Sequence, residues 1–293
     1  MPERDGYIPG VPCALDATHP DPEAAVAFYS GLFGWECEDV MPPEAEAKYF
    51  VARLRGRDVA AVGSIEVAPQ TATWNTYFWV DNADEAASKV RDAGGSVLME
   101  PFDIKPDAGR KAICTDREGA TFSVWQAKSN RGAQLVNEPG SLVFNGLNTR
   151  DIEGAKSFYG RVFGWRTLTL DSGAEMWALP GYGDYLERDN PDLREQLAEM
   201  GGPGYEDVVA SIDPITHDQP DAPPHWSVTF AVDDPNATAA KATELGGTVI
   251  APPLATPWSR PGYYRVHLTI IKDPQGATFG ASKFVPENKA LGS

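Results

Sequence analysis

The 293-residue sequence contains an internal duplication, and this feature constrains its fold more than any other. The segment DPEAAVAFYSGLFGW at 21–35 recurs as DIEGAKSFYGRVFGW at 151–165. A second segment, which begins WNTYFWVDNADEAASKV at Trp74, recurs as WSVTFAVDDPNATAAKA at Trp226. Each copy of the second segment closes with a matching stretch, TDREGATF or KDPQGATF. The chain therefore consists of two units, A and B, in the order A-B-A-B.

The local pattern of each unit predicts a strand, a helix and then further strands. In the first A unit, Asp21 is a natural N-cap, Pro22 a natural first helical residue and Gly34 a natural left-handed terminator. The apolar residues between them recur at helical spacing. The B units predict helices over 83–93 and 235–245. Short β-branched and aromatic runs predict strands, and in the first half these include 77–80, 97–99, 112–115 and 121–125.

Two such units together predict an α+β fold with two tandem domains. Each domain is expected to be a pair of βαβββ modules that form one curved, mostly antiparallel sheet with helices on its convex side. We expect a first domain over 1–130, a linker over 131–139 and a second domain over 140–293. Each domain has a size at which it can bury its own core.

The second A unit is longer than the first, because Tyr29 and Tyr159 are 130 residues apart but Trp74 and Trp226 are 152 apart. The difference predicts a helical insertion near 185–204. Such an insertion can be a lid over a ligand, a surface decoration or part of the domain interface.

Charge and hydropathy exclude several classes of partner. The formal net charge of −17 argues against nucleic acid and anionic membrane surfaces. No apolar run reaches the roughly 20 residues that cross a bilayer, and the start of the sequence lacks the pattern of a secretory signal. The three cysteines form no CxxC pair, which is typical of free thiols in a reducing compartment. We therefore expect a cytoplasmic protein.

The duplicated strand–helix unit, the FY pair in the A helix and the D-P-x-G-A-x-F close of the B unit resemble the vicinal-oxygen-chelate (VOC) superfamily. This superfamily contains glyoxalases, bleomycin-resistance proteins and extradiol dioxygenases. Local stretches such as FDI…AGR, TDREGA and PGYGDYLE are similar to its two-domain actinobacterial type. That type includes a mycobacterial glyoxalase-like antigen and accessory "hydroxylase" proteins of aromatic polyketide (doxorubicin-type) clusters.

The resemblance also implies where a metal would bind, because catalytic members hold a divalent ion with His, Gln or Glu in the cleft of the sheet. The implied positions are the first strand of each unit and the end of each B unit. None of the six matching residues is a usual strong ligand. They are Ala14, Asn75, Ser123, Phe144, Ser227 and Gly280. The expectation is therefore no metal and no cofactor.

Of the four histidines, His19 and His217 are interpreted as solvent-exposed loop residues. His225 and His267 belong to the second domain, where they could form an atypical metal site with an acidic residue such as Glu175. The alternative is that they cap or pack like ordinary histidines. If the protein is an enzyme, the catalytic candidates are His225, His267 and Asp16.

Aromatic and polar residues expected at the cleft predict a site for a flat aromatic ligand. Asn75, Tyr77 and Trp79 alternate along one strand, so they share a face, while Trp74 points away. These three are the preferred ligand-binding residues of the first domain. The further candidates are Tyr49, Trp125, Asn145, Trp177, His225, Ser227, Trp258 and Tyr263.

Two hypotheses for function follow. The first is a metal-free binding protein for an aromatic secondary metabolite, of the polyketide or antibiotic type, that acts in sequestration, self-resistance or relief of product inhibition. The second is a polyketide-tailoring hydroxylase, cyclase or lyase that uses an atypical metal or none. Both imply a small aromatic ligand. A biosynthetic enzyme is a further expected partner, and the chain is expected to be a monomer or a homodimer.

Overall fold

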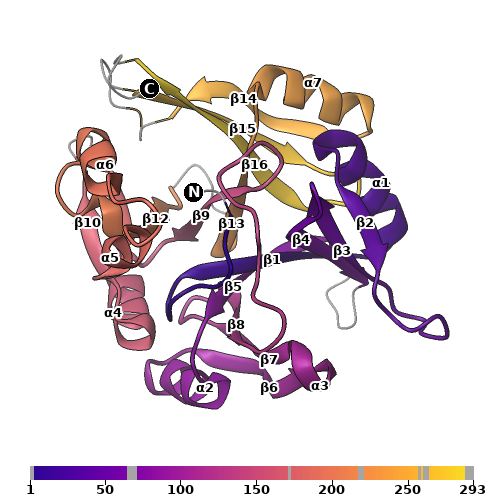
Figure 1. Ribbon diagram of the computed structural model, residues 1–293, viewed down its shortest axis with the longest axis horizontal. Coiled ribbons are helices and arrows are strands. Elements are labelled where there is room, and N and C mark those ends of the chain that lie inside the picture. The colour runs from indigo at the N-terminus through magenta and orange to yellow at the C-terminus, as the bar shows by residue number, and fades with distance from the viewer. Residues whose placement is uncertain are drawn as a thin grey trace.

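Two curved eight-stranded sheets form the framework of the protein in the computed structural model, which describes residues 3–64, 71–170, 173–216, 221–256, 259 and 264–287 (Figure 1). The strand order is β2-β3-β4-β1-β5-β8-β7-β6 in the first sheet and β10-β11-β12-β9-β13-β16-β15-β14 in the second. The predicted α+β class and the predicted division into two sheets are confirmed. Within each sheet the pairs are antiparallel except β1 with β4, β5 with β8, β9 with β12 and β13 with β16.

The four modules contribute four strands and one principal helix each. Those of the first half are β1 (Pro12–His19), α1 (Pro22–Phe33), β2 (Glu36–Asp39), β3 (Tyr49–Leu54), β4 (Arg57–Ser64), β5 (Thr73–Trp79), α2 (Ala83–Asp92), β6 (Ser96–Ile104), the short α3 (Lys105–Ala108), β7 (Gly109–Thr115) and β8 (Thr121–Ala127). Those of the second half are β9 (Leu142–Thr149), α4 (Ile152–Phe163), β10 (Arg166–Thr169), β11 (Glu175–Ala178), α5 (Tyr182–Leu186), α6 (Leu193–Gly201), the 3₁₀ turn η1 (Tyr205–Asp207), β12 (Val208–Pro214), β13 (His225–Ala231), α7 (Pro235–Glu244), β14 (Thr248–Ala255), β15 (Tyr264–Lys272) and β16 (Thr278–Pro286).

The helix ends follow the residues that the duplication repeats. Asp21 caps α1 by accepting a hydrogen bond from the amide of Ala24, and Asp151 caps α4 in the same way. Gly34 and Gly164 end these helices at φ 73° and 75°, in the left-handed region that glycine enters without steric cost. Both A helices therefore begin and end where the sequence predicts.

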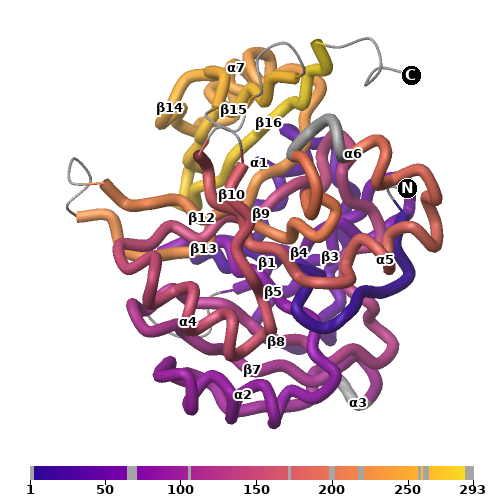
Figure 2. Tube along the Cα trace, turned by 90° about the vertical axis from the view of Figure 1, so that its left-hand side faces the viewer, coloured from indigo at the N-terminus to yellow at the C-terminus, as the bar shows by residue number. Residues whose placement is uncertain are grey.

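The two large hydrophobic cores lie between the two halves of the chain. One core joins α1 and β1–β4 of the first module to β13, β16 and α7 of the fourth. The other joins β5–β8 and α2 of the second module to α4, β11 and β12 of the third. Figure 2 shows α2 beside α4 and α1 near α7. The helices on the convex faces thus become the interface between the two sheets.

The repeated FY and FGW residues of the A units build this interface. Phe33 packs its ring 5.0 Å from Phe230 of the other half, and Phe163 packs 5.0 Å from Phe78. The indole N–H of Trp35 donates to the carbonyl of Gly140 at 2.8 Å. Trp165 makes the equivalent bond to Gly10 at 3.0 Å. Each copy of the FGW motif therefore packs against the opposite half of the chain.

The third module differs from the first at one connection. In the first module β3 and β4 are joined by a tight hairpin through Arg55 and Gly56, both with positive φ. In the third module α5, α6 and η1 separate β11 from β12. The Tyr185 hydroxyl of α5 donates to the carbonyl of Gly6 at 2.9 Å, so the insertion contacts the N-terminal segment. The sequence allowed three roles for this insertion: a lid, a surface decoration or part of the domain interface. The hydrogen bond to Gly6 shows that the insertion contributes to the contact between the two halves.

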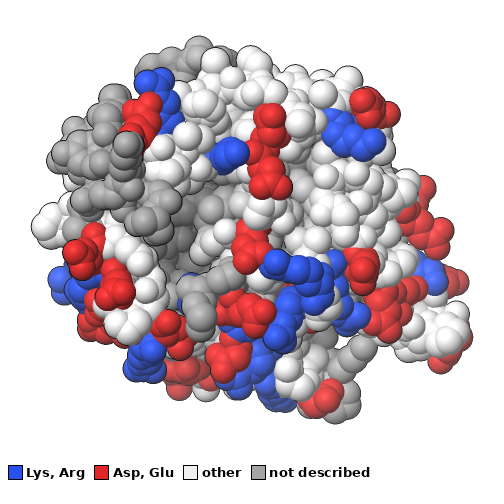
Figure 3. All heavy atoms as spheres, turned by 45° about the horizontal axis from the view of Figure 1, so that its top comes forward, with Lys and Arg blue, Asp and Glu red and all other residues white. Residues whose placement is uncertain are grey.

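Acidic and basic side chains are mixed over the surface shown in Figure 3. Many of the charges form exposed pairs, such as Arg57 with Glu3 and Arg265 with Glu287. Among the described residues, the helices are all too short or too polar to cross a membrane.

Candidate functional sites on the open faces

Each sheet has one face turned toward the interdomain cores and an opposite face, here called its open face. Because side chains alternate along a strand, the buried core residue Leu15 places its neighbours Ala14 and Asp16 on the open face of the first sheet. Asp16 lies in register with Asn75 of β5 on one side and with Ala61 of β4 on the other. This puts a carboxylate in the middle of the sheet.

Asp16 is a buried carboxylate surrounded by donors, and its side chain is only 3% exposed. The amide of Asn75 donates to its Oδ1 at 2.8 Å, and the hydroxyls of Tyr49 and Tyr77 both donate to its Oδ2. Burial, followed by the negative charge of Asp16, raises the pKa of both phenols well above the usual tyrosine value. The phenols therefore stay protonated, and Asp16 serves as the acceptor of the cluster.

Lys111 of β7 adds a cation to this cluster. Its ammonium donates to the Tyr77 hydroxyl at 2.9 Å and lies 5.2 Å from the centre of the Tyr77 ring and 5.9 Å from that of Phe102. It forms no ion pair with a described carboxylate. Lys111, Tyr77 and Asp16 thus form a hydrogen-bonded chain from a half-buried cation to a buried anion.

The two tryptophans predicted beside this cluster are held by other parts of the chain. The guanidinium of Arg131 lies 5.8 Å from the Trp79 ring, and the Tyr7 ring lies 6.1 Å from it. The indole N–H of Trp125 donates to the carbonyl of Asn130 at 3.0 Å, and its ring is 6.3 Å from that of Tyr77. Of the preferred trio, Asn75 and Tyr77 therefore converge on Asp16, while Trp79 faces the N-terminal segment.

The open face of the second sheet has a different polar centre. Gly146 of β9 occupies the position of Asp16, in register with Ser211 of β12 and Ser227 of β13. The carboxylate of this face comes instead from Asp213, two residues further along β12, where it accepts a hydrogen bond from Ser211 at 2.7 Å. The aromatic and basic residues Tyr77, Trp125 and Lys111 have no counterparts here, because Thr229, Ser282 and Leu268 occupy the corresponding positions.

The histidines do not assemble into the site considered from the sequence. His225 is exposed at the start of β13, where its Nδ1 lies 2.8 Å from the carbonyl oxygen of Pro223. His267 is in β15, in register with Lys283. Glu175, the acidic partner considered for them, forms an ion pair with Lys156 at 2.8 Å. His217 lies outside the described residues.

Two predicted ligand-binding residues face the wrong side. Asn145 is buried on the core face and accepts a hydrogen bond from Thr76 at 2.9 Å across the interface between the halves. Trp177 is fully buried in the interdomain core, 5.5 Å from Tyr159. Trp74 points to the core as predicted and donates to the Tyr29 hydroxyl. The remaining candidates Trp258 and Tyr263 lie outside the described residues.

The repeat alignment contained a signal for Asn145 but none for Trp177. Asn145 aligns with Leu15, an apolar residue directly before the charged Asp16, and this marks a core position. In β11 the run Met176–Ala178 is buried without alternation, so periodicity cannot assign a face to Trp177. Sequence reasoning also missed Lys111 and Asp213. Each is a charged residue inside a strand, which is the signal that could have identified them.

The donor set of the open faces does not fit the divalent metal that the fold family implies. Among the described residues, no three His, Cys, Asp or Glu side chains come close enough together to hold an ion. Asp16, the carboxylate closest to the implied positions, has its oxygens directed at N–H and O–H donors, whereas a metal site requires unprotonated ligands that converge on one point.

Away from the open faces, two equivalent junctions between the halves contain buried carboxylates. Tyr29 donates to Asp273 at 2.8 Å, and Tyr159 donates to Asp116 at 3.1 Å. At the first junction His19, predicted to be exposed, is instead completely buried, with its Nε2 2.6 Å from Asp273 Oδ2. The sequence around His19 could not predict this contact, because its partner Asp273 is more than 250 residues away in the chain.

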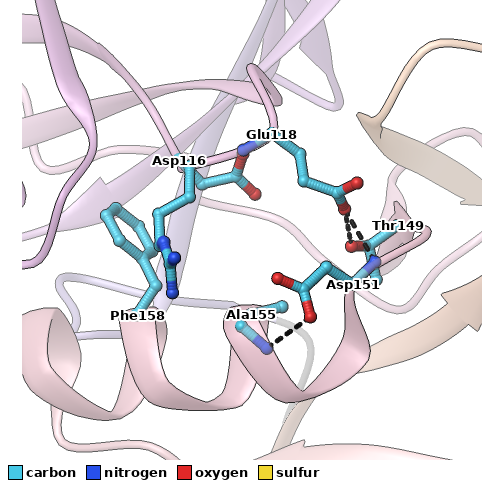
Figure 4. A pocket seen from close by; sticks show the side chains of 8 residues that line it. Asp116, Glu118, Thr149, Asp151, Ala155 and Phe158 are labelled. Carbon is cyan, nitrogen blue, oxygen red and sulfur yellow. Dashed lines mark hydrogen bonds between the residues drawn. The ribbon is translucent and has the colours of Figure 1, made fainter.

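At the second junction Thr149 stands in place of His19 and donates to Glu118 (Figure 4). The amide of Asp151 also donates to Glu118, at 3.0 Å. A cavity of about 10 Å³, room for one water molecule, remains between Asp116, Asp151 and Phe158. It is too small for an organic ligand, so we regard this pocket as a packing feature of the junction.

Comparison with known proteins connects these observations to relatives. The family model described as Glyoxalase/Bleomycin resistance protein/Dioxygenase superfamily matches residues 14–124 and 141–280. The chain is 38% identical to CFP32 of Mycobacterium tuberculosis, which carries the name of a glyoxylase, over 98% of this chain and 100% of that protein. It is 34% identical to the anthracycline biosynthesis protein DnrV of Streptomyces peucetius, over 93% of each chain.

Solved structures with the same architecture have little sequence in common with this chain. The Mn(II)-bound glyoxalase from Novosphingobium aromaticivorans has a TM-score of 0.58 and 15% identity, covering 95% of this chain and 85% of that one. A mutant of 4-hydroxymandelate synthase from Streptomyces coelicolor has a TM-score of 0.57 and 11% identity, covering 98% and 94%. At this level of identity the likeness concerns the fold alone.

Proposed function

The chain belongs to the Glyoxalase/Bleomycin resistance protein/Dioxygenase superfamily, and on this premise we propose that it binds an aromatic small molecule on the open face of its first sheet. The ligand is of the polyketide type and carries an acidic phenol or a carbonyl oxygen. Binding requires no metal, and it serves to sequester the molecule or to relieve product inhibition in its biosynthesis.

The observation that carries the proposal is the half-buried ammonium of Lys111, which lies among aromatic rings and has no carboxylate partner among the described residues. A cation in this setting favours a ligand with a partly negative oxygen, and the rings of Tyr77 and Phe102 favour a flat one. Asp16 cannot repel such a ligand strongly, because Tyr49, Asn75 and Tyr77 already donate to it.

The sequence relatives support the class of ligand. DnrV of Streptomyces peucetius and DauV of a Streptomyces strain are both anthracycline biosynthesis proteins, and each matches nearly the whole chain. Anthracyclines are flat, polycyclic and phenolic, which are the properties that the first open face selects.

A second candidate function is favoured by one observation, the hydrogen-bonded chain from Lys111 through Tyr77 to Asp16. Such a chain can move a proton between a bound ligand and a buried carboxylate, as an acid–base enzyme requires. This candidate differs from binding alone in predicting a change in the mass of the ligand, or its isomerisation, after incubation.

The test is calorimetric titration of the full chain with an anthracycline aglycone, which has the ring system but no sugar. Lys111→Met should weaken binding about 10- to 100-fold, because a charge-assisted hydrogen bond is lost. Lys272→Met is the matched control, since it removes the same charge from an exposed position of β15 and should leave the affinity unchanged.

Mass spectrometry and chromatography of the recovered ligand decide between the two candidates. An unaltered aglycone supports binding alone. A converted ligand, together with a Tyr77→Phe variant that still binds but no longer converts it, establishes the acid–base enzyme instead. If the wild-type protein does not bind the aglycone, or binds it as tightly after Lys111→Met, the proposed site is wrong.

A further inference from the structure

Three oxygen atoms converge on one point of the second open face. A Cβ atom built on Gly146 would lie 3.0 Å or less from Asp213 Oδ2, Ser211 Oγ and Ser227 Oγ. The three oxygens come from strands on both sides of β9, and the register of β9 with β12 and β13 fixes their positions. A side chain at this position would collide with these oxygens, so glycine is what allows all three to gather over β9.

The hydrogens of both hydroxyls are already donated within the protein. Ser211 donates to Asp213 Oδ2 at 2.7 Å, and Ser227 donates to the carbonyl of Gly146 at 3.1 Å. A hydroxyl has one hydrogen and two lone pairs, so these two groups can offer only lone pairs to a ligand. Together with the carboxylate, the group presents acceptors and no donor.

The charge around Asp213 also lacks compensation. Its pKa is raised by burial, an effect that the hydrogen bond from Ser211 and the charge of His225 only partly oppose. No lysine or arginine in the described part of the chain forms an ion pair with Asp213. His225 itself is exposed and turned to the carbonyl of Pro223. A bound cation would restore the ionised form of this carboxylate.

From this arrangement we infer that the second open face is a separate binding site for a primary ammonium group, held by Asp213, Ser211 and Ser227 above Gly146. An ammonium has three N–H donors and no acceptor, so it matches a site of three acceptor oxygens one to one. The ligand class is a small molecule with a protonated primary amine, such as an amino sugar. The site is independent of the aromatic site proposed on the first sheet.

The probe is an anthracycline that carries a primary amino sugar, compared with the same molecule acetylated on that nitrogen. Acetylation removes the positive charge and two of the donors. Native mass spectrometry and calorimetry of the full chain should detect a site that takes the amine about 10- to 100-fold more tightly than the amide. Asp213→Asn, which keeps the shape of the side chain, should abolish this preference.

Matched variants separate this site from the first open face. Ser227→Ala should weaken amine binding by a smaller factor than Asp213→Asn, because one neutral acceptor is lost. Asp189→Asn, an exposed charge change on the inserted segment, should have no effect. Lys111→Met should weaken only the binding of the aglycone and leave the preference for the amine intact.

The two proposals can fail separately. An amine preference that survives Asp213→Asn, or equal affinity of wild-type protein for amine and amide, overturns the ammonium site whatever the aglycone does. Loss of the amine preference in Asp213→Asn supports the ammonium site even if the aglycone fails to bind the first face.

Discussion

The two open faces have the same strand arrangement but different polar centres. On the first, Asp16 of the central strand accepts hydrogen bonds from Tyr49, Asn75 and Tyr77. The ammonium of Lys111 donates to the Tyr77 hydroxyl and lies beside this cluster. On the second, the central position is Gly146, and the carboxylate has moved to Asp213, where one serine is its hydrogen-bond donor.

The difference shows how a duplicated sheet can acquire two chemistries without changing its backbone. The register of the strands is the same in both sheets. The aspartate lies on the central strand in the first sheet, but on the neighbouring strand and two residues further along in the second. This shift, together with the loss of Tyr77 and Lys111 from the second face, changes the polar centre. The first face becomes a donor surface among aromatic rings. The second becomes an acceptor surface beside smaller side chains.

The largest expected effect is on the free energy of unfolding, and it should differ between variants of Asp16 and of Asp213. Asp16→Ala removes the acceptor of three donors in a buried cluster and should lower the free energy of unfolding by about 4 kcal/mol. Asp213→Ala should change it by less than about 1 kcal/mol, because this group is half-buried and has a single donor. Urea unfolding of both variants measures the contrast, and equal losses would show that both carboxylates are structural.

The two junctions between the halves also differ, because His19 pairs with a buried carboxylate at the first and Thr149 takes its place at the second. His19→Thr installs at the first junction the residue type of the second, and should cost about 3 kcal/mol at neutral pH because it removes the partner of a buried carboxylate. Thermal or urea unfolding gives the value. A loss below about 1 kcal/mol would mean that the hydrogen bonds from Tyr29 and the backbone suffice to hold Asp273.

The pair of His19 and Asp273 also predicts that stability depends on pH. Although burial acts to raise the pKa of Asp273, the hydrogen bond and charge of His19, with the hydrogen bond from Tyr29, hold it below the usual aspartate value. A depressed carboxyl pKa contributes stability above the unfolded value of about 3.9, and this contribution disappears as the pH falls through the folded pKa. The gap in stability between wild type and His19→Thr should therefore narrow below about pH 4.

The smallest effect on stability is expected when residues of the first junction are introduced into the second. Burial raises the pKa of Asp116 above the usual aspartate value, so the stability linked to this group is lost as the pH rises through the folded pKa. The double variant Thr149→His with Glu118→Gln copies His19 and Gln275 of the first junction. It should gain about 1 kcal/mol at neutral pH if the added ring is accommodated. A loss of similar size would show that the narrow space at this junction outweighs the new pair.

Much of the fold could be predicted from the sequence, and the site only in part. Asp21, Gly34 and their copies predicted the ends of the A helices, because capping depends on neighbouring backbone groups alone. The alternation of Asn75 and Tyr77 predicted that they share a face, for the same local reason. Lys111 could not be joined to them, because its contact with Tyr77 depends on β7 pairing with β8 and β8 with β5.

The sequence by itself determined the A-B-A-B plan, the secondary structure and the side on which most strand residues point, since these depend on contacts between residues near in the chain. The tertiary structure decided which modules share a core, why His19 is buried and which oxygens meet above Gly146. These outcomes join residues far apart in the chain. The physical reason is that periodicity specifies the face of a strand but carries no information about what that face will meet.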